Sequence, residues 1–271
     1  MKIEPLTPAI GAQILDVDLG QLSPELVSDI RAALLRYKVI FFRNQNITSE
    51  QHIGFARSFG ELEIHPATPK GQPNPEVLRI EHGPKSRGAE NFWHSDVTWR
   101  MKPSLGSVLR AHEIPSVGGD TLFANMTLAY NRLPEVTKEK IQDCVAVHDI
   151  ARVFASRLNK KPEELHELYP PVEHPVVRTH PETKEPVVYV NGAFTSHIKG
   201  METEESRRLL DTLYKSAWDP EVQCRFQWQA DSIAFWDNRA CQHFAVSDYF
   251  PAVRAMERVT IAGDKPYFDN R

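Results

Sequence analysis

The chain has 271 residues with a formal net charge of −4, of which 41% are hydrophobic and 25% charged. We expect one domain over residues 1–271, because this length can bury one large core. The mild acidity gives no reason to expect nucleic-acid or membrane binding, and no apolar run is long enough to span a bilayer. The chain lacks an apolar N-terminal signal region, and its three cysteines show no CxxC spacing. We therefore expect a reducing, cytoplasmic location.

The N-terminal part of the chain carries clear helix and strand patterns. Ser23 and Pro24 offer an N-cap and a first-turn proline, and apolar residues then follow at helical spacing, which predicts a helix over 24–38. A buried strand is expected at 39–42 and a second helix at 49–59. Residues 61–92 are rich in proline, glycine and charge, so we expect loops there, interrupted by a short strand at 77–80.

The remainder of the chain alternates short strand patterns with grouped helical patterns. This mixture favours an α+β protein built on an antiparallel barrel or sandwich. The predicted helices cover 133–143, 161–168 and 203–217. The predicted strands cover 106–111, 120–124, 145–150, 175–180, 186–190, 224–229, 232–236 and 257–262.

The most informative stretch is residues 93–98, WHSDVT, which places a histidine and an aspartate two positions apart. β-favouring residues flank them, and on a strand positions i and i+2 point to the same face. His94 and Asp96 would then grip one metal ion, and an imidazole with a carboxylate suits a first-row ion such as Fe(II). Such a pair is weak evidence alone. A strand-and-turn pattern near the other end of the chain, leading to His243, strengthens it.

Several motifs in order resemble the taurine dioxygenase family of Fe(II)- and 2-oxoglutarate-dependent oxygenases. The resemblance runs nearly from end to end. It implies a double-stranded β-helix (jelly-roll) core with helices packed outside, and it implies O₂ and 2-oxoglutarate as co-substrates. The motifs are HSDVT at 94–98, GGDT at 118–121, WDNR at 236–239, QH at 242–243, and the arginines Arg254 and Arg258.

The resemblance implies a metal-binding triad of His94, Asp96 and His243. Three protein ligands leave three of six positions open on the iron, which suits a bidentate 2-oxo acid together with O₂. A lone histidine at position 243 would more often be a buried structural residue. Its combination with the upstream His-x-Asp pair favours the ligand role.

Two arginines near the C-terminus point to two anions. By resemblance Arg254 binds the distal carboxylate of 2-oxoglutarate and Thr121 adds a hydroxyl, and a planar guanidinium does bind carboxylates bidentately. A surface salt bridge is the ordinary alternative for such an arginine. Arg258 shares a face with Arg254 if this stretch is extended, so its anion should be the primary substrate.

The resemblance also implies a substrate pocket. His65 would contact the substrate oxyanion together with Arg258 and the backbone N–H of Val97. Phe154 and Phe194 match aromatic residues that wall the substrate, although plain core packing is the ordinary expectation for two phenylalanines.

Three positions depart from the family pattern around the substrate amine. Thr68 stands for a tyrosine, Val153 for a serine and Glu90 for an asparagine. The thinner polar set favours a less polar anionic substrate than taurine, because an unpaired buried ammonium is costly. We expect an alkyl sulfate or alkanesulfonate, giving an aldehyde plus sulfate or sulfite with release of succinate and CO₂. Glu90 would instead favour an amine if it points inward.

Other functions stay open at this point. The same chemistry could act on a carboxylate such as an aryloxyalkanoate or an amino-acid derivative, because a guanidinium accepts either anion. A zinc-dependent hydrolase could use His94 and Asp96 but would not need Arg254 or Thr121. A jelly-roll binding protein without activity is disfavoured by the intact triad. Family members are often dimers or tetramers, so we expect a homo-oligomer.

Overall fold

The computed structural model describes residues 1–65, 68–69 and 71–269. The strands of its largest sheet are, in spatial order, β1 (Lys2–Pro5), β2 (Ala12–Leu15), β3 (Val39–Phe42), β14 (Ile233–Asp237), β6 (Gly106–Glu113), β16 (Arg254–Ile261) and β4 (Leu62–Glu63). A further strand, β5 (Val77–His82), also pairs with β16. β2 and β3 are parallel, and every other pair of neighbours is antiparallel.

A second sheet packs against the large one. It contains β13 (Gln223–Phe226), β7 (Thr121–Asn125) and β15 (Cys241–Ala245), all antiparallel. The core between the two sheets is aromatic: Phe41 of β3 stacks on Phe226 of β13 with ring centroids 4.0 Å apart. This two-sheet core with helices outside is the α+β jelly-roll architecture predicted from the sequence.

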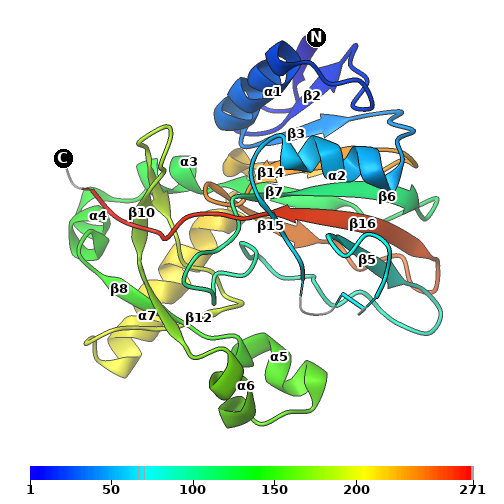
Figure 1. Ribbon diagram of the computed structural model, residues 1–271. Helices are drawn as coiled ribbons and strands as arrows, with labels where there is room; N and C mark the ends of the chain where they lie inside the picture. The colour runs from blue at the N-terminus through cyan, green and yellow to red at the C-terminus, as the bar shows by residue number, and fades with distance from the viewer. Residues whose placement is uncertain (66–67, 70, 270–271) are drawn as a thin grey trace.

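Two helices cover the outer face of the large sheet (Figure 1). They are α1 (Pro24–Tyr37), capped by Ser23, and α2 (Ser49–Arg57), which begins with a capping box of Thr48 and Gln51. Their apolar faces pack on alternate residues of the sheet, because strand side chains alternate between its two faces. Among the described residues, no helix has the length and apolarity needed to cross a membrane.

The remaining elements form a layer on the other side of the core. β8 (Val145–His148) pairs with β9 (Val172–Pro175) and β12 (Thr195–Ile198), and β10 (Val177–Thr179) pairs with β11 (Pro186–Val188). Figure 1 shows α5 (Ala151–Leu158) and α6 (Pro162–Leu168) at the end opposite α1. The other helices are α3 (Met126–Asn131), α4 (Glu135–Ile141), α7 (Thr203–Lys215) and two 3₁₀ turns at Ser216–Trp218 and Pro220–Val222.

Most predicted elements are present, with ends that shift by a few residues. The expectation that failed most clearly is a strand running to residue 150. That strand ends at His148, and the chain enters α5 instead. The helices α3 and α5 were not predicted, nor were the strands β1, β2, β4, β9, β12 and β15. α3 has six residues and is marginal without tertiary packing. α5 begins without a capping side chain, so no local signal marks its start, whereas the shorter α6 begins with a first-turn proline.

Candidate active site

His94 and His243 are joined directly through their backbones. Each backbone N–H donates to the other residue's carbonyl, at 3.1 and 2.8 Å, in an isolated bridge beside β15. Asp96 lies in the turn that follows and not on a strand. The predicted strand geometry for His94 and Asp96 is therefore wrong. Their convergence comes from a bridge followed by a turn, and Val97 completes the turn with a left-handed φ of 49°.

The three side chains form a compact buried cluster. Asp96 Oδ1 lies 3.8 Å from Nε2 of His94 and 4.0 Å from Nε2 of His243, and the ligand atoms all lie within 4.8 Å of one another. His94 Nδ1 lies 2.9 Å from the Phe92 carbonyl, an acceptor, so Nδ1 carries the proton and Nε2 stays available to a metal. Burial lowers the pKa of His94, and it lowers the pKa of His243 to about 3. Two neutral imidazoles and one carboxylate are the donor set of a non-haem Fe(II) site with open positions.

Asp96 is held from several sides. Burial alone would raise its pKa, but the Arg258 guanidinium, with Nη1 3.1 Å from Asp96 Oδ1, and the two imidazoles keep that pKa below its usual range. Ser107 Oγ donates to Oδ2 at 3.3 Å. The side-chain amide of Asn238 clamps the backbone of Asp96, accepting from its N–H at 2.6 Å and donating to its carbonyl at 3.0 Å. The carboxylate therefore stays charged and oriented toward the imidazoles.

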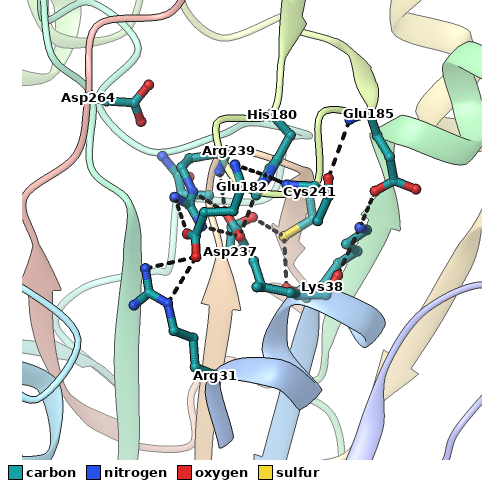
Figure 2. A network of polar contacts seen from close by, with 12 residues as sticks. Arg31, Lys38, His180, Glu182, Glu185, Asp237, Arg239, Cys241 and Asp264 are labelled. Carbon is teal, nitrogen blue, oxygen red and sulfur yellow. Dashed lines mark hydrogen bonds and ion pairs between the residues drawn. The ribbon is translucent and has the colours of Figure 1, made fainter. Parts of the chain in front are cut away.

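The turn that carries Asn238 is anchored by a buried ionic network (Figure 2). Asp237 accepts from His180 Nε2 at 3.0 Å and from Arg239 at 2.7 and 2.8 Å, and it is fully buried. Arg239 then pairs with Glu182 at 2.8 Å, and Glu182 with Arg31 of α1 at 2.9 Å. Sequence reasoning recognised this segment only as a motif. Its structural role depends on partners distant in the chain.

An inner cavity of about 70 Å³ lies beside the triad and contains both Arg254 and Thr121. The Arg254 side chain enters it from β16, with Nε donating to the Gly119 carbonyl at 3.1 Å. Gly118 and Gly119 both have positive φ (82° and 72°), so the turn that presents this carbonyl suits glycine. Arg254 Nη2 is buried without a hydrogen-bond partner among the described residues. An unsatisfied buried cationic donor is costly, so this cavity fits an anionic oxygen.

The Thr121 hydroxyl completes the inner cavity. It accepts a hydrogen bond from Trp228 Nε1 at 3.0 Å. The centre of the same indole ring lies 5.7 Å from Cζ of the Arg254 guanidinium. Arg258 lines this cavity as well, so both arginines of β16 face inward, as their spacing predicts. The cavity thus combines two cations, one hydroxyl and the metal-binding histidines.

An outer cavity of about 180 Å³ shares Ile80, Glu90, His94 and Arg258 with the inner one. All predicted substrate residues line it, namely His65, Val97, Phe154, Phe194 and Arg258. Burial, reinforced by Arg258, lowers the pKa of His65 to about 4, so this imidazole is neutral at pH 7 and Arg258 supplies the positive charge. The remaining lining is largely apolar and includes Val153. Thr68 is absent from the described lining of both cavities.

A polar network not anticipated from the sequence supports the Val97 turn. His174 Nε2 lies 2.9 Å from the carbonyls of both Thr98 and Arg100. Asn191 Nδ2 donates to the Thr98 hydroxyl at 3.1 Å, while its Oδ1 accepts from the Phe194 N–H at 2.9 Å. One buried amide therefore links the turn at Val97 to the loop that carries Phe194.

Known proteins share this architecture and sequence. Residues 2–260 match the family described as taurine catabolism dioxygenase TauD, TfdA. The chain is 36% identical to an alpha-ketoglutarate-dependent sulfate ester dioxygenase of Pseudomonas putida, covering 98% of this chain and 91% of that protein. It is 33% identical to an (S)-phenoxypropionate/alpha-ketoglutarate dioxygenase of Sphingobium herbicidovorans, covering 97% and 95%. A taurine dioxygenase structure from Burkholderia xenovorans superposes with a TM-score of 0.87 at 38% identity, covering 99% and 91%.

Proposed function

The chain belongs to the TauD, TfdA family of dioxygenases, and on that premise we propose that it oxidises an alkyl sulfate or alkanesulfonate at the carbon bearing the anionic group. It is an Fe(II)- and 2-oxoglutarate-dependent dioxygenase. His94, Asp96 and His243 would hold the iron, which when bound couples O₂ reduction to the decarboxylation of 2-oxoglutarate. This chain's own residues bind and orient the two organic anions and keep water from the reacting carbon.

We assign 2-oxoglutarate to the inner cavity. Arg254 supports this because its Nη2 is a buried donor that lacks a partner among the described residues, and a carboxylate would satisfy it. The Thr121 hydroxyl lines the same cavity and accepts a hydrogen bond from Trp228, whose ring lies beside the Arg254 guanidinium. It can give the co-substrate a further hydrogen bond. This geometry supports the co-substrate roles proposed for both residues.

We assign the anionic head of the primary substrate to Arg258, His65 and Val97. Arg258 donates Nη1 to Asp96, but its Nε is a buried donor without a partner among the described residues. A sulfate or sulfonate oxygen can therefore bind Arg258 while the bond to Asp96 persists. Neutral His65 can add an N–H without a second charge, and Val97 can add a backbone N–H. Arg258 is the one cationic side chain among the described residues that lines both cavities, and this observation carries the proposal.

The outer cavity suits an apolar tail. Leu78, Ile80, Phe92, Val153 and Phe194 contribute apolar walls beyond the head-binding residues. A buried methylene is worth about 0.8 kcal/mol, so alkyl chains gain affinity there until the cavity is full. Glu90 lines both cavities, but its carboxylate is already bonded to His82 and Arg157. It therefore does not offer an unpaired charge to a substrate amine.

The product follows from the position of oxidation. Hydroxylation of the carbon bonded to the ester oxygen of an alkyl sulfate gives a hemiacetal-like sulfate, which breaks its C–O bond to yield an aldehyde and sulfate. Hydroxylation of an alkanesulfonate at the corresponding carbon yields an aldehyde and sulfite. In both cases one O₂ is consumed, and 2-oxoglutarate becomes succinate and CO₂.

A substrate panel tests this proposal. Purified enzyme with Fe(II) and 2-oxoglutarate should form succinate in step with aldehyde when given hexyl sulfate or pentanesulfonate, and taurine should be a poor substrate. The alternative is a carboxylate substrate, which the Sphingobium relative's activity on phenoxypropionate favours. Faster turnover of aryloxyalkanoates than of every sulfate and sulfonate would overturn the proposal.

We also propose that residues 1–271 act as a single dioxygenase domain, in the cytoplasm, as a dimer or tetramer. The sequence expectations support these assignments. Sedimentation analysis of the purified chain tests the oligomeric state, and a monomer at micromolar concentration would contradict it.

A further inference from the structure

An ion pair between two distant parts of the chain forms part of the wall of the outer cavity. Arg157 projects from α5, and its Nη1 lies 3.3 Å from Oε1 of Glu90 in the segment before the metal-binding turn. Arg157 also donates to the carbonyl of Ala89, and His82 Nε2 lies 3.2 Å from the other oxygen of Glu90. Both members of the pair line the outer cavity.

The pair lies at the solvent side of that cavity. Side-chain exposure rises from 8% at Asp96 and 14% at Arg258 to 29% at Arg157 and 37% at Glu90. Within the outer cavity Arg258 therefore lies at the buried end and Arg157 at the exposed end, with Glu90 beside Arg157 and also bordering the inner cavity. A substrate whose anionic head is bound by Arg258 directs its tail toward the Glu90–Arg157 pair.

The surroundings of the pair are apolar and aromatic. The Arg157 guanidinium lies 5.5 Å from the ring centre of Phe92 and 5.9 Å from that of Phe154, and both rings line the cavity. A charged tail that packs against these rings would lose part of its hydration without finding an unpaired countercharge. An uncharged tail leaves the pair intact and packs against the rings.

We propose that the Glu90–Arg157 pair selects substrates by the charge at the end remote from the sulfate or sulfonate. The inference rests on the function proposed above and deepens it: uncharged tails are accepted, while ammonium and carboxylate tails are rejected because each countercharge is already occupied. Removing one partner takes the ionic partner from the other, although Glu90 keeps its contact with His82 and Arg157 its bond to the Ala89 carbonyl. Arg157→Gln therefore lets Glu90 attract an ammonium tail, and Glu90→Gln lets Arg157 attract a carboxylate tail.

The test compares kcat/KM for alkyl, aminoalkyl and carboxyalkyl sulfates and sulfonates of matched chain length, measured by succinate formation at saturating 2-oxoglutarate. Arg157→Gln should raise the ratio of aminoalkyl to alkyl activity about tenfold, and Glu90→Gln should raise the carboxyalkyl ratio by about the same factor, which corresponds to about 1.4 kcal/mol. The double variant should keep the Tm of the wild type, since a partly exposed pair contributes little to stability, and it should show neither of the two raised ratios.

Arg207→Gln is the matched control. It breaks a more exposed ion pair with Glu204 on α7, at 2.8 Å, outside the described lining of both cavities, and should leave all ratios unchanged. Unchanged ratios in both single variants, with alkyl sulfates or sulfonates still turned over, would overturn this inference alone. Absence of sulfate and sulfonate turnover in the wild-type enzyme would overturn the proposed function and this inference with it.

Discussion

Replacing Asn238 by alanine should separate the support of the metal site from the stability of the fold. The amide makes two hydrogen bonds to the backbone of Asp96 and two to Ser104, between 2.6 and 3.2 Å, and the side chain is fully buried. The amide nitrogen shares two hydrogens among three acceptors, so three full bonds at about 1 kcal/mol each, plus the desolvation cost of the abandoned backbone groups of Asp96, give an expected loss of about 4 kcal/mol. In a chain of this size that lowers Tm by about 7 °C.

The metal should also bind more weakly, because the clamp fixes the peptide that carries the Asp96 carboxylate. Loss of a residue that orients a ligand typically weakens metal binding about 10–100-fold. The assay is a calorimetric titration of the metal-free protein with Mn(II), paired with thermal unfolding without metal. Ser104→Ala is the control: it removes one contact of Asn238 but leaves the Asp96 clamp, so Tm should fall by less and Mn(II) affinity should stay near that of the wild type. A lower Tm with unchanged Mn(II) affinity in Asn238→Ala would refute the reasoning.

Four further outcomes are expected. His243→Ala should abolish Fe(II)-dependent succinate formation and retain the fold by circular dichroism; full activity would remove it from the ligand set. Arg254→Ala should raise KM for 2-oxoglutarate, with a cost of about 2–5 kcal/mol, whereas Arg258→Ala should mainly weaken the sulfate or sulfonate, and kinetics with each substrate varied in turn would expose a shared effect. kcat/KM should rise about fourfold per added methylene until the outer cavity is full, which a series of alkyl sulfates measures. The free energy of unfolding should fall as pH drops from about 6.5 to about 4, because burial lowers the pKa of His52 and His174 to about 4 while the unfolded histidines already bind protons in this range. Urea titrations at each pH measure this, and the unfolding free energy of His52→Gln should depend less steeply on pH.

The sequence alone was enough for the parts of the molecule whose physics is local. The helices α1 and α2 begin where Ser23 and Thr48 cap them, because a capping side chain satisfies N–H groups within three residues of itself. The identity of the three metal ligands also followed from the sequence, since few residue types bind a first-row metal and these stand in recognisable motifs. The jelly-roll core was predicted in the same way, from family motifs and strand patterns.

Tertiary structure alone decided how those residues are held. His94 and Asp96 converge through a bridge to His243 and a turn, and the amide that fixes this turn is 142 residues away, on Asn238. Glu90 pairs with Arg157 across 67 residues, and Arg157 lies on α5, a helix without a capping side chain that no local pattern signalled. A hydrogen bond or ion pair depends on distance in space, and periodicity carries no information about which distant segments the packed sheets bring together. The residue types therefore indicated the chemistry of the site, while tertiary packing determined the Asn238 contacts that hold Asp96 and the Glu90–Arg157 pair.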